Sequence, residues 1–200
     1  MSQSKEEFRS KCLKSLQKSF KTPSYAKQKL LNLKLQKLIK KLGAKTILFY
    51  YPLAREGDIK TTLNQLRKKS DIYLPFMEKD SFKMVLFRLP LERKKFGIFE
   101  PKGSTKLLKK IDLAIVPIVG VDSTGRRIGY GKGMYDRFFD RLQYAPKKIF
   151  IQYKFCYSKE IITDFYDITA DYLLTPTRLY SVVRKKNDKR ITFKRNNCIS

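Results

Sequence analysis

Residues 122–136, DSTGRRIGYGKGMYD, have the residue types and spacing of a phosphate-binding loop. Three glycines alternate with other residues in it, namely Gly129, Gly131 and Gly133. A glycine has no Cβ atom, so its backbone N–H group can approach an anion closely. A helix that begins just after the loop adds partial positive charge, and Lys132, Arg126 and Arg127 add full charges. The segment therefore predicts a site for phosphate.

The loop differs from the two commonest nucleotide-binding motifs. A P-loop needs G-x-x-x-x-G-K-[ST], but Gly133 follows Lys132 where a hydroxyl should hold magnesium. The glycine spacing also differs from G-x-G-x-x-G, so neither a Walker ATPase nor a Rossmann dehydrogenase is indicated. A tight turn is the plain alternative, but the strand–loop–helix context favours phosphate. Asp136 suits either a magnesium ligand or a charge that compensates the helix dipole.

The elements that must position this loop follow from the hydrophobic pattern. The strongest strand, over 110–121, precedes the loop, and a helix over 134–142 follows it. Further helices are expected over 4–20, 25–42, 59–69 and 158–165, and strands over 46–51, 72–76, 82–87, 148–153 and 172–174. This alternation predicts an α/β fold, with a mostly parallel central sheet and helices on both faces in a single three-layer domain.

The chain is expected to divide into a domain over 1–176 and a basic tail over 177–200 that contains RKKNDKR. Residues 182–183 and 191–193 of the tail are expected to form a small hairpin.

Composition excludes several kinds of chemistry. The 200 residues include 45 Lys+Arg and 18 Asp+Glu, a net charge of +27, and no His. Ser-His-Asp and Cys-His catalysis and His-ligated metals are therefore excluded. Acid–base chemistry must use carboxylates, Lys, Tyr or the substrate. With 42% hydrophobic residues, the chain is too apolar for a disordered basic tail.

The three cysteines, Cys12, Cys156 and Cys198, lie far apart and form no C-x-x-C pair. We therefore expect no disulfide framework and no zinc site, and a reducing, cytoplasmic location. The N-terminus lacks the apolar core of a signal peptide, and no apolar run approaches the ~18 residues of a spanning helix.

The charge of +27 also admits a different class of function, a basic RNA- or ribosome-binding protein. The basic tail and the many Tyr and Phe residues, which stack well on bases, favour it. However, solvated helix faces account for most of the lysines, and core packing accounts for most of the aromatic residues. No RNP-type aromatic motif and no G-x-x-G clamp occurs in a suitable context.

The segment RIGYGKGMYDRFF, preceded by DLAIVPIVGVDSTG, resembles the signature of the 5-formyltetrahydrofolate cyclo-ligase family, also called methenyltetrahydrofolate synthetases. The family pattern is D-x-x-G-x-R-[LI]-G-x-G-x-G-[YF]-Y-D, and Met134 departs from it where an aromatic residue is usual. The resemblance extends over about residues 4–176. It includes K-x-x-[LF]-R at 5–9, an acidic loop after the strand at 46–51, and GIFEP at 97–101.

The resemblance implies an ATP-dependent ring closure. The formyl oxygen of 5-formyltetrahydrofolate takes the γ-phosphoryl group of ATP, and N10 then attacks the activated carbon. Phosphate then leaves the folate, and the products are 5,10-methenyltetrahydrofolate, ADP and phosphate. The nucleophiles belong to the substrates, which suits a chain without His. The implied partners are ATP, Mg²⁺ and the folate, with or without a polyglutamate tail, bound by a monomer without nucleic-acid or membrane partners.

The resemblance also implies roles for particular residues. Lys132 and Arg127 are expected to act on the transferred phosphoryl group, and Asp136 and Asp167 to hold Mg²⁺, with Asp171 as a near neighbour of the latter. The expected ATP-binding residues are Lys5, Arg9, Arg127, Ile128, Gly129, Tyr130, Gly131, Lys132, Gly133, Met134 and Tyr135. The expected folate-contacting residues are Tyr130, Tyr135 and an acid that is either Glu56 or Asp58. A catalytically inactive homologue is the remaining reading, but the chain retains Lys132, Asp136 and the glycines.

Overall fold

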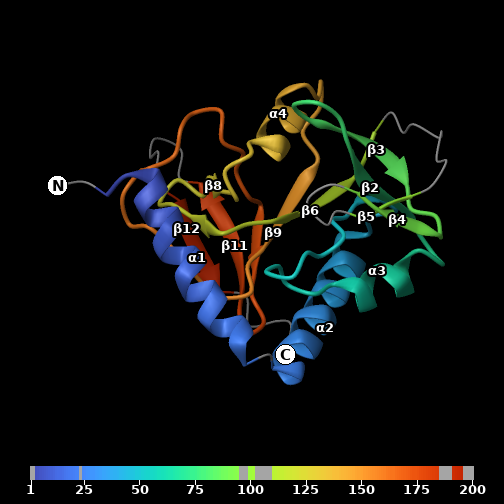
Figure 1. Cartoon of the computed structure of the whole chain (residues 1–200), viewed down its shortest axis with the longest axis horizontal. Helices are drawn as coiled ribbons and strands as arrows, with labels where there is room; N and C mark the ends of the chain where they lie inside the picture. Colours follow the sequence, from blue (N-terminus) through green and yellow to red (C-terminus); the bar gives the residue numbers. More distant parts are fainter. Residues whose placement is uncertain (1–2, 23, 95–98, 102–109, 185–190, 196–200) are drawn as a thin grey trace.

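The computed structural model describes residues 3–22, 24–94, 99–101, 110–184 and 191–195. Its central sheet has eight strands (Figure 1). Their order is β12 (Ile191–Arg195), β11 (Leu179–Arg184), β10 (Tyr172–Leu174), β9 (Lys147–Ile151), β6 (Leu113–Pro117), β1 (Thr46–Leu48), β2 (Asp71–Met77) and β3 (Phe82–Leu86). The five central strands, β10, β9, β6, β1 and β2, are parallel to one another. At the two edges of the sheet, β3, β11 and β12 pair antiparallel.

Helices cover both faces of this sheet, as the sequence predicts. The helices are α1 (Lys5–Lys21), α2 (Tyr25–Leu42), α3 (Lys60–Leu66) and α4 (Met134–Asp140). Successive side chains of a strand point to opposite faces. On β6, Leu113 and Ile115 join a core cluster with buried residues of α2 and α3. Ala114 and Val116 join the opposite cluster, which contains Phe138 of α4. These layers confirm the predicted α/β class.

Helix α1 lies beside the sheet rather than in either layer (Figure 1). Its buried residues Phe8, Cys12 and Leu16 recur every fourth position and form one stripe. Phe8 and Cys12 pack against Val119, which follows β6, and against Ile128, which directly precedes the glycine loop (residues 129–133). A capping box at Ser4 fixes the first helical turn. The sequence therefore holds the N-terminus of α1 next to the glycine loop.

Several boundaries differ from those expected. The strand predicted over 110–121 divides into β6 and a short β7 (Gly120–Val121), which pairs with β8 (Arg127–Ile128). The pair β4 (Leu91–Arg93) and β5 (Phe99–Pro101) was not predicted. The helix predicted over 158–165 was wrong, because the segment consists of bends and turns held by side-chain hydrogen bonds. In the tail, β11 and β12 confirm the predicted pairing, although residues 187–188 lie outside the described residues. The division of the chain into a domain over 1–176 and a basic tail over 177–200 stays a prediction.

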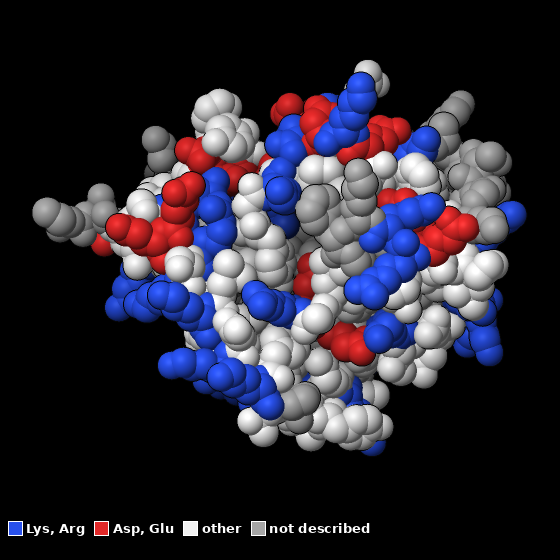
Figure 2. All heavy atoms as spheres, viewed as in Figure 1, with Lys and Arg blue, Asp and Glu red and all other residues white. Residues whose placement is uncertain are grey.

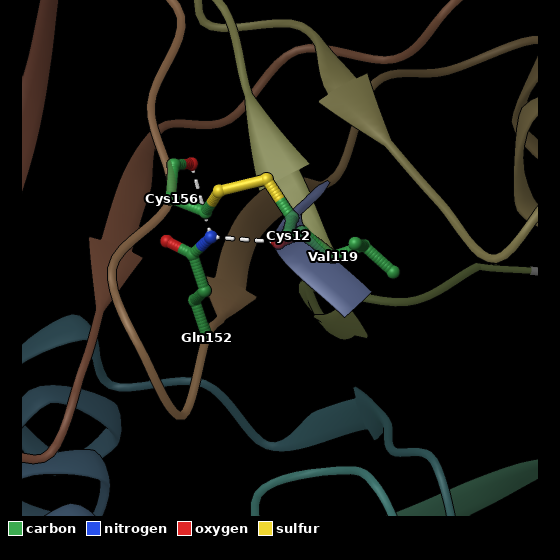
Figure 3. Close-up of a disulfide and its surroundings, with 4 residues drawn as sticks. All are labelled: Cys12, Val119, Gln152 and Cys156. Atoms are coloured by element: carbon green, nitrogen blue, oxygen red, sulfur yellow. Dashed lines mark hydrogen bonds between the residues drawn. A yellow bond between two sulfur atoms is a disulfide. The ribbon is translucent and has the colours of Figure 1, made fainter. Parts of the chain in front are cut away.

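The expectation about the cysteines was wrong for one pair. Cys12 of α1 forms a disulfide with Cys156, which follows β9 (Figure 3). The side chain of Gln152 holds the Cys156 segment, because its Nε2 donates to the carbonyl oxygens of Val119 at 2.9 Å and Cys156 at 3.0 Å. The two cysteines are 144 positions apart and are brought together because α1 packs against this segment. Their spacing along the chain gives no sign of this pairing. Cys198 lies outside the described residues.

Among the described residues, no helix is long and apolar enough to cross a membrane.

Candidate active site

A cavity of about 520 Å³ lies where the first turn of α1, the glycine loop and residues 164–167 meet. The basic residues that line it are Lys5, Arg9, Arg127, Lys132 and Arg137. The acidic residues that line it are Glu6, Asp136, Asp140, Asp164 and Asp167. A cavity with charges of both signs is suited to an anion and an accompanying cation.

Lys and Arg side chains occur in several parts of the visible face, mixed with acidic groups at the top and right and in a run without acidic groups at the lower left (Figure 2).

The glycines are required by the backbone at two positions of the loop. Gly131 has a φ of +103° and Gly133 a φ of +62°, both in the left-handed region that residues with a Cβ rarely adopt. At Gly129, an added Cβ would collide with the guanidinium of Arg127. Arg9 reaches the loop from α1, because its Nε donates to the carbonyl oxygen of Gly129 at 3.0 Å. The loop is therefore open on the side that faces the cavity and is braced by two arginines.

Arg127 is a buried cation in the cavity wall. Its Nη1 donates to Oδ2 of Asp136 at 3.1 Å, and its Nε donates to the carbonyl oxygen of Pro117 at 3.2 Å. The guanidinium also lies 5.1 Å from the centre of the Tyr135 ring. Asp136 is held from its other side, since the N–H of Ile168 donates to Oδ1 at 3.2 Å. These contacts fix both charges at the first turn of α4.

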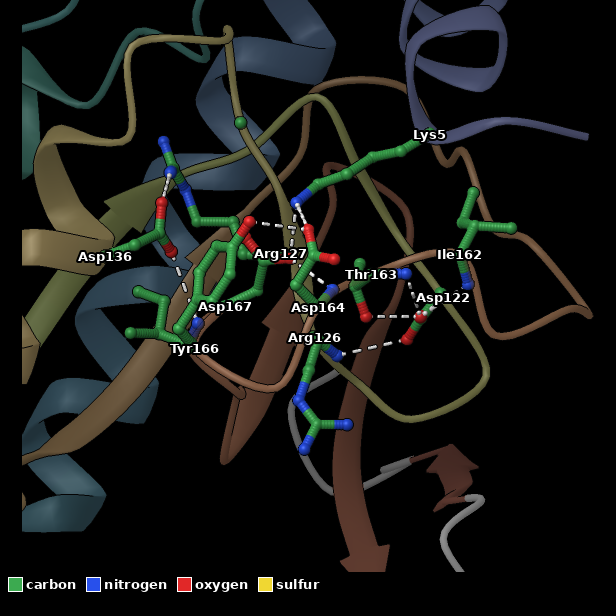
Figure 4. Close-up of polar contacts among 12 residues, drawn as sticks. Lys5, Asp122, Arg126, Arg127, Asp136, Ile162, Thr163, Asp164, Tyr166 and Asp167 are labelled. Atoms are coloured by element: carbon green, nitrogen blue, oxygen red, sulfur yellow. Dashed lines mark hydrogen bonds and ion pairs between the residues drawn. The ribbon is translucent and has the colours of Figure 1, made fainter.

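Lys5 lies between two carboxylates (Figure 4). Its Nζ donates to Oδ2 of Asp167 at 2.5 Å and to Oδ2 of Asp164 at 2.9 Å. Desolvation lowers the pKa of Lys5, but the hydrogen bonds and charges of Asp167 and Asp164 outweigh it and raise the pKa overall. Lys5 therefore stays charged in the cavity, and Tyr166 stands 5.6 Å from its ammonium group.

Glu56 lies in a second cluster, beside the phosphate-facing cavity. Burial raises its pKa to about 7, although a hydrogen bond from the N–H of Leu53 and the charge of Arg127 oppose the shift. The pKa values of Tyr130 and Tyr135 are raised by burial and then by the charge of Glu56, which places the three groups within electrostatic reach of one another. The Tyr130 hydroxyl also donates to the carbonyl oxygen of Arg55 at 3.0 Å.

The alternative acid, Asp58, points elsewhere. Its side chain is 44% exposed and forms an ion pair with Lys60 at 3.4 Å. Its Oδ1 accepts a hydrogen bond from the N–H of Lys60, the first residue of α3, at 2.9 Å. The geometry therefore favours Glu56 as the acid that faces the tyrosines.

The structure brings most of the predicted nucleotide-binding residues to one cavity, and their roles stay predictions. Those that line it are Lys5, Arg9, Arg127, Gly129, Gly131, Lys132, Gly133, Asp136 and Asp167. Ile128 is fully buried and packs against Phe8 instead. Tyr130, Met134 and Tyr135 are not among the lining residues. Asp171 lies away from the cavity, where its carboxylate accepts from the N–H of Lys148 at 2.8 Å. In GIFEP, residues 97–98 lie outside the described residues.

Sequence reasoning missed five cavity residues. They are Glu6, Arg137, Asp140, Asp164 and Tyr166. Asp164 and Tyr166 lie within three residues of Asp167, and this proximity is the one signal in the sequence that could have indicated them. Asp122 matches the first acid of the family signature, but its buried setting follows only from the structure.

Asp136 and Asp167 fit a magnesium ion that arrives with a nucleotide. Mg²⁺ is usually held by one or two carboxylates together with phosphate oxygens and water. Both carboxylates line the same cavity, and both pair with a cation through Oδ2. Within the described residues, no group of three or more acidic or cysteine side chains could hold a metal without such help.

The sheet, the glycine loop and the charged cavity together define an α/β enzyme that acts on a phosphate-bearing substrate. Comparison with known proteins identifies which one. The model of the 5-formyltetrahydrofolate cyclo-ligase family matches residues 1–166. The chain therefore belongs to this family. The match ends one residue before Asp167.

Individual relatives agree with the family. A 5-formyltetrahydrofolate cyclo-ligase of Haemophilus influenzae is 29% identical over 144 residues, which cover 66% of this chain and 75% of the relative. One of Escherichia coli K12 is 26% identical over 147 residues, covering 68% and 81%. The structure of 5,10-methenyltetrahydrofolate synthetase from Aquifex aeolicus superposes with a TM-score of 0.71 at 25% identity, over 97% of this chain and 98% of that one. The structure of the 5,10-methenyltetrahydrofolate synthetase from Mycoplasma pneumoniae superposes with a TM-score of 0.64 at 25% identity, over 86% of this chain and 98% of that one.

Proposed function

We propose that this chain converts 5-formyltetrahydrofolate into 5,10-methenyltetrahydrofolate and consumes ATP, with release of ADP and phosphate. The observation that carries the proposal is the convergence of four cations, Lys5, Arg9, Arg127 and Lys132, on one cavity beside the Glu56 cluster. Arg127 belongs to both places, because it lines the cavity and stacks on Tyr135. Phosphates and folate would thus meet at Arg127.

The cations perform the part of phosphoryl transfer that a protein supplies, which is positioning and charge neutralisation. Lys132 and the backbone of the glycine loop cradle the phosphates, while Lys5 and Arg9 hold them from α1. Arg127 faces the group in transfer. Its ion pair with Asp136 at 3.1 Å and its buried setting fix the guanidinium before the substrates arrive.

Asp136 and Asp167 would hold Mg²⁺ in this cavity. When bound, the ion neutralises phosphate charge. In the absence of phosphates, Arg127 and Lys5 neutralise the same two carboxylates.

Glu56, Tyr130 and Tyr135 would contact the folate. The carboxyl group of Glu56, with a pKa of about 7, is partly protonated near neutral pH. It can therefore both donate a hydrogen bond to the folate and accept one from it. The buried tyrosine hydroxyls stay protonated and present donors at the same place.

The RNA-binding alternative finds no support. The family model and the relatives named above are all of the cyclo-ligase family. A cytoplasmic location and a monomeric state stay predictions, as does a preference for polyglutamylated folate.

A turnover assay tests the proposed function. The purified chain is mixed with 5-formyltetrahydrofolate, ATP and Mg²⁺, and the absorbance of the methenyl product is followed. We expect product only when ATP and the folate are both present. Absence of product from a folded protein under these conditions would exclude the proposed activity.

A further inference from the structure

Asp122 is a fully buried carboxylate at the start of the glycine-loop region, and it does not line the cavity (Figure 4). Six donors point to it. Oδ1 accepts from the N–H of Thr124 at 2.9 Å, the hydroxyl of Thr124 at 2.6 Å and the N–H of Arg126 at 3.4 Å. Oδ2 accepts from the N–H of Ile162 at 3.2 Å, the N–H of Thr163 at 3.1 Å and the hydroxyl of Thr163 at 2.5 Å. All six donors are uncharged, and they replace the water that a buried carboxylate loses.

The two oxygens of Asp122 join two different segments. Oδ1 holds the turn that leads into the glycine loop, and Oδ2 holds residues 162–163. This second segment lies in the long connection between β9 and β10, and its described residues form no helix or strand. A segment without regular structure has no ladder to fix it, so its position depends on side-chain anchors such as Asp122.

The segment held by Asp122 carries the carboxylates that hold Lys5. Asp164 follows Thr163 directly, and its N–H donates to Oδ2 of Asp167 at 2.7 Å. The same Oδ2 accepts from Lys5 at 2.5 Å. At its far end the segment is fixed to the phosphate-facing cations, because the N–H of Arg127 donates to the carbonyl oxygen of Ile168 at 2.8 Å.

We propose that Asp122 is a positioning residue of the nucleotide site. It holds residues 162–168 against the glycine loop, so that Asp167 and Lys5 face the phosphates, and it touches no substrate itself. The inference rests on the proposed function. Residues 164, 166 and 167 of the held segment line the cavity, and Glu56, Tyr130 and Tyr135 do not, so loss of Asp122 should raise the KM for ATP and leave the KM for the folate unchanged.

The first variant is Asp122→Asn, which keeps the shape and turns one acceptor oxygen into a donor facing other donors. We expect the KM for ATP to rise at least about tenfold, because buried N–H groups lose their acceptor. The KM for the folate should stay within about twofold of the wild type. Asp112→Asn is the control. Asp112 also accepts hydrogen bonds from two backbone N–H groups, those of Lys45 and Thr46, but it does so at the N-terminal end of β1 and does not line the cavity. This control should change neither KM.

A double-mutant cycle separates positioning from a general structural role. If Asp122 acts through Lys5, the factors by which Lys5→Ala and Asp122→Asn each raise the KM for ATP should not multiply in the double variant. The double variant should then have the same KM for ATP as Lys5→Ala alone. Multiplicative effects, or an equal rise in the KM for ATP and for the folate, would overturn the proposal. Should Asp122→Asn not fold, Thr163→Val removes the shortest of the six bonds at similar volume and is expected to act in the same direction.

Hydrogen exchange tests the same point without any substrate. In Asp122→Asn, amides over 158–168 should exchange faster, while those of β6 and β9 should be unchanged. Equal protection over 158–168 in variant and wild type would overturn the anchoring role whatever the activity. A wild type without ATP-dependent turnover would instead exclude the proposed function, and with it the role of Asp122 in ATP binding.

Discussion

Nζ of Lys5 lies 2.5 Å from Oδ2 of Asp167, although the two residues are 162 positions apart. The contact joins the first turn of α1 to the connection before β10, and the glycine loop lies between them in the cavity wall. The proposed nucleotide site is therefore assembled from segments far apart in the sequence, and we expect changes at Lys5 or at Asp167 to affect ATP binding.

We expect Lys5→Ala to raise the KM for ATP about tenfold, because the variant loses one charge-assisted contact to phosphate. The loss of stability should be small, about 1 kcal/mol or less, since salt and water weaken ion pairs this close to the surface. Steady-state kinetics with ATP varied, together with urea unfolding, measure both. Lys11→Ala, on the exposed side of the same helix, is the control and should behave as the wild type.

Lys132→Ala should lower kcat by about a hundredfold or more, because a preorganised charge at the transferred phosphoryl group is lost. The exposed side chain makes a small contribution to folding, so the free energy of unfolding should change by less than about 0.5 kcal/mol. Lys132→Arg keeps the charge and should retain more activity than the Ala variant. Normal turnover in Lys132→Ala would refute its role at the phosphates.

The raised pKa of Glu56 predicts that the free energy of unfolding falls as the pH rises towards about 7. Its pKa is raised from 4.5 to about 7 in the folded state, so between these values the folded protein binds the proton more tightly than the unfolded chain. The stabilisation is complete below about pH 4.5 and is lost as the pH rises through about 7, and it amounts to at most about 3 kcal/mol. Urea unfolding from about pH 5 to pH 8 should show this fall in the wild type and not in Glu56→Gln. Parallel pH profiles of the two proteins would contradict the buried, proton-binding carboxyl.

The disulfide between Cys12 and Cys156 should stabilise the fold. Linking distant residues restricts the unfolded chain, and such links typically contribute roughly 2–4 kcal/mol. We expect a reductant or Cys12→Ser to lower the free energy of unfolding by this amount, with no further effect of reductant on Cys12→Ser. Cys198→Ser is the control and should unfold as the wild type. If alkylation and mass spectrometry of the purified protein find Cys12 and Cys156 both as free thiols, the link is absent.

The sequence predicted those parts of the fold that local pattern determines. The stripe of α1, the glycines and the alternation of strands and helices along the chain could be recognised because periodicity and left-handed turns are reflected in neighbouring residues. The segment over 158–165 could not, since Asp122, some 40 positions earlier, determines its course. The pairing of Cys12 with Cys156 and that of Arg127 with Asp136 likewise depend on packing between elements. Similarly, Glu56 could be distinguished from Asp58 only once their side-chain directions were known.

The most direct test of the proposed reaction measures ATP consumption and methenyl product together in the wild-type protein. We predict that ADP and 5,10-methenyltetrahydrofolate appear in equal amounts, and that ADP formation stops when 5-formyltetrahydrofolate is omitted. ATP hydrolysis at the same rate without the folate, or methenyl product formed without ADP, would contradict a phosphoryl transfer from ATP to the formyl oxygen.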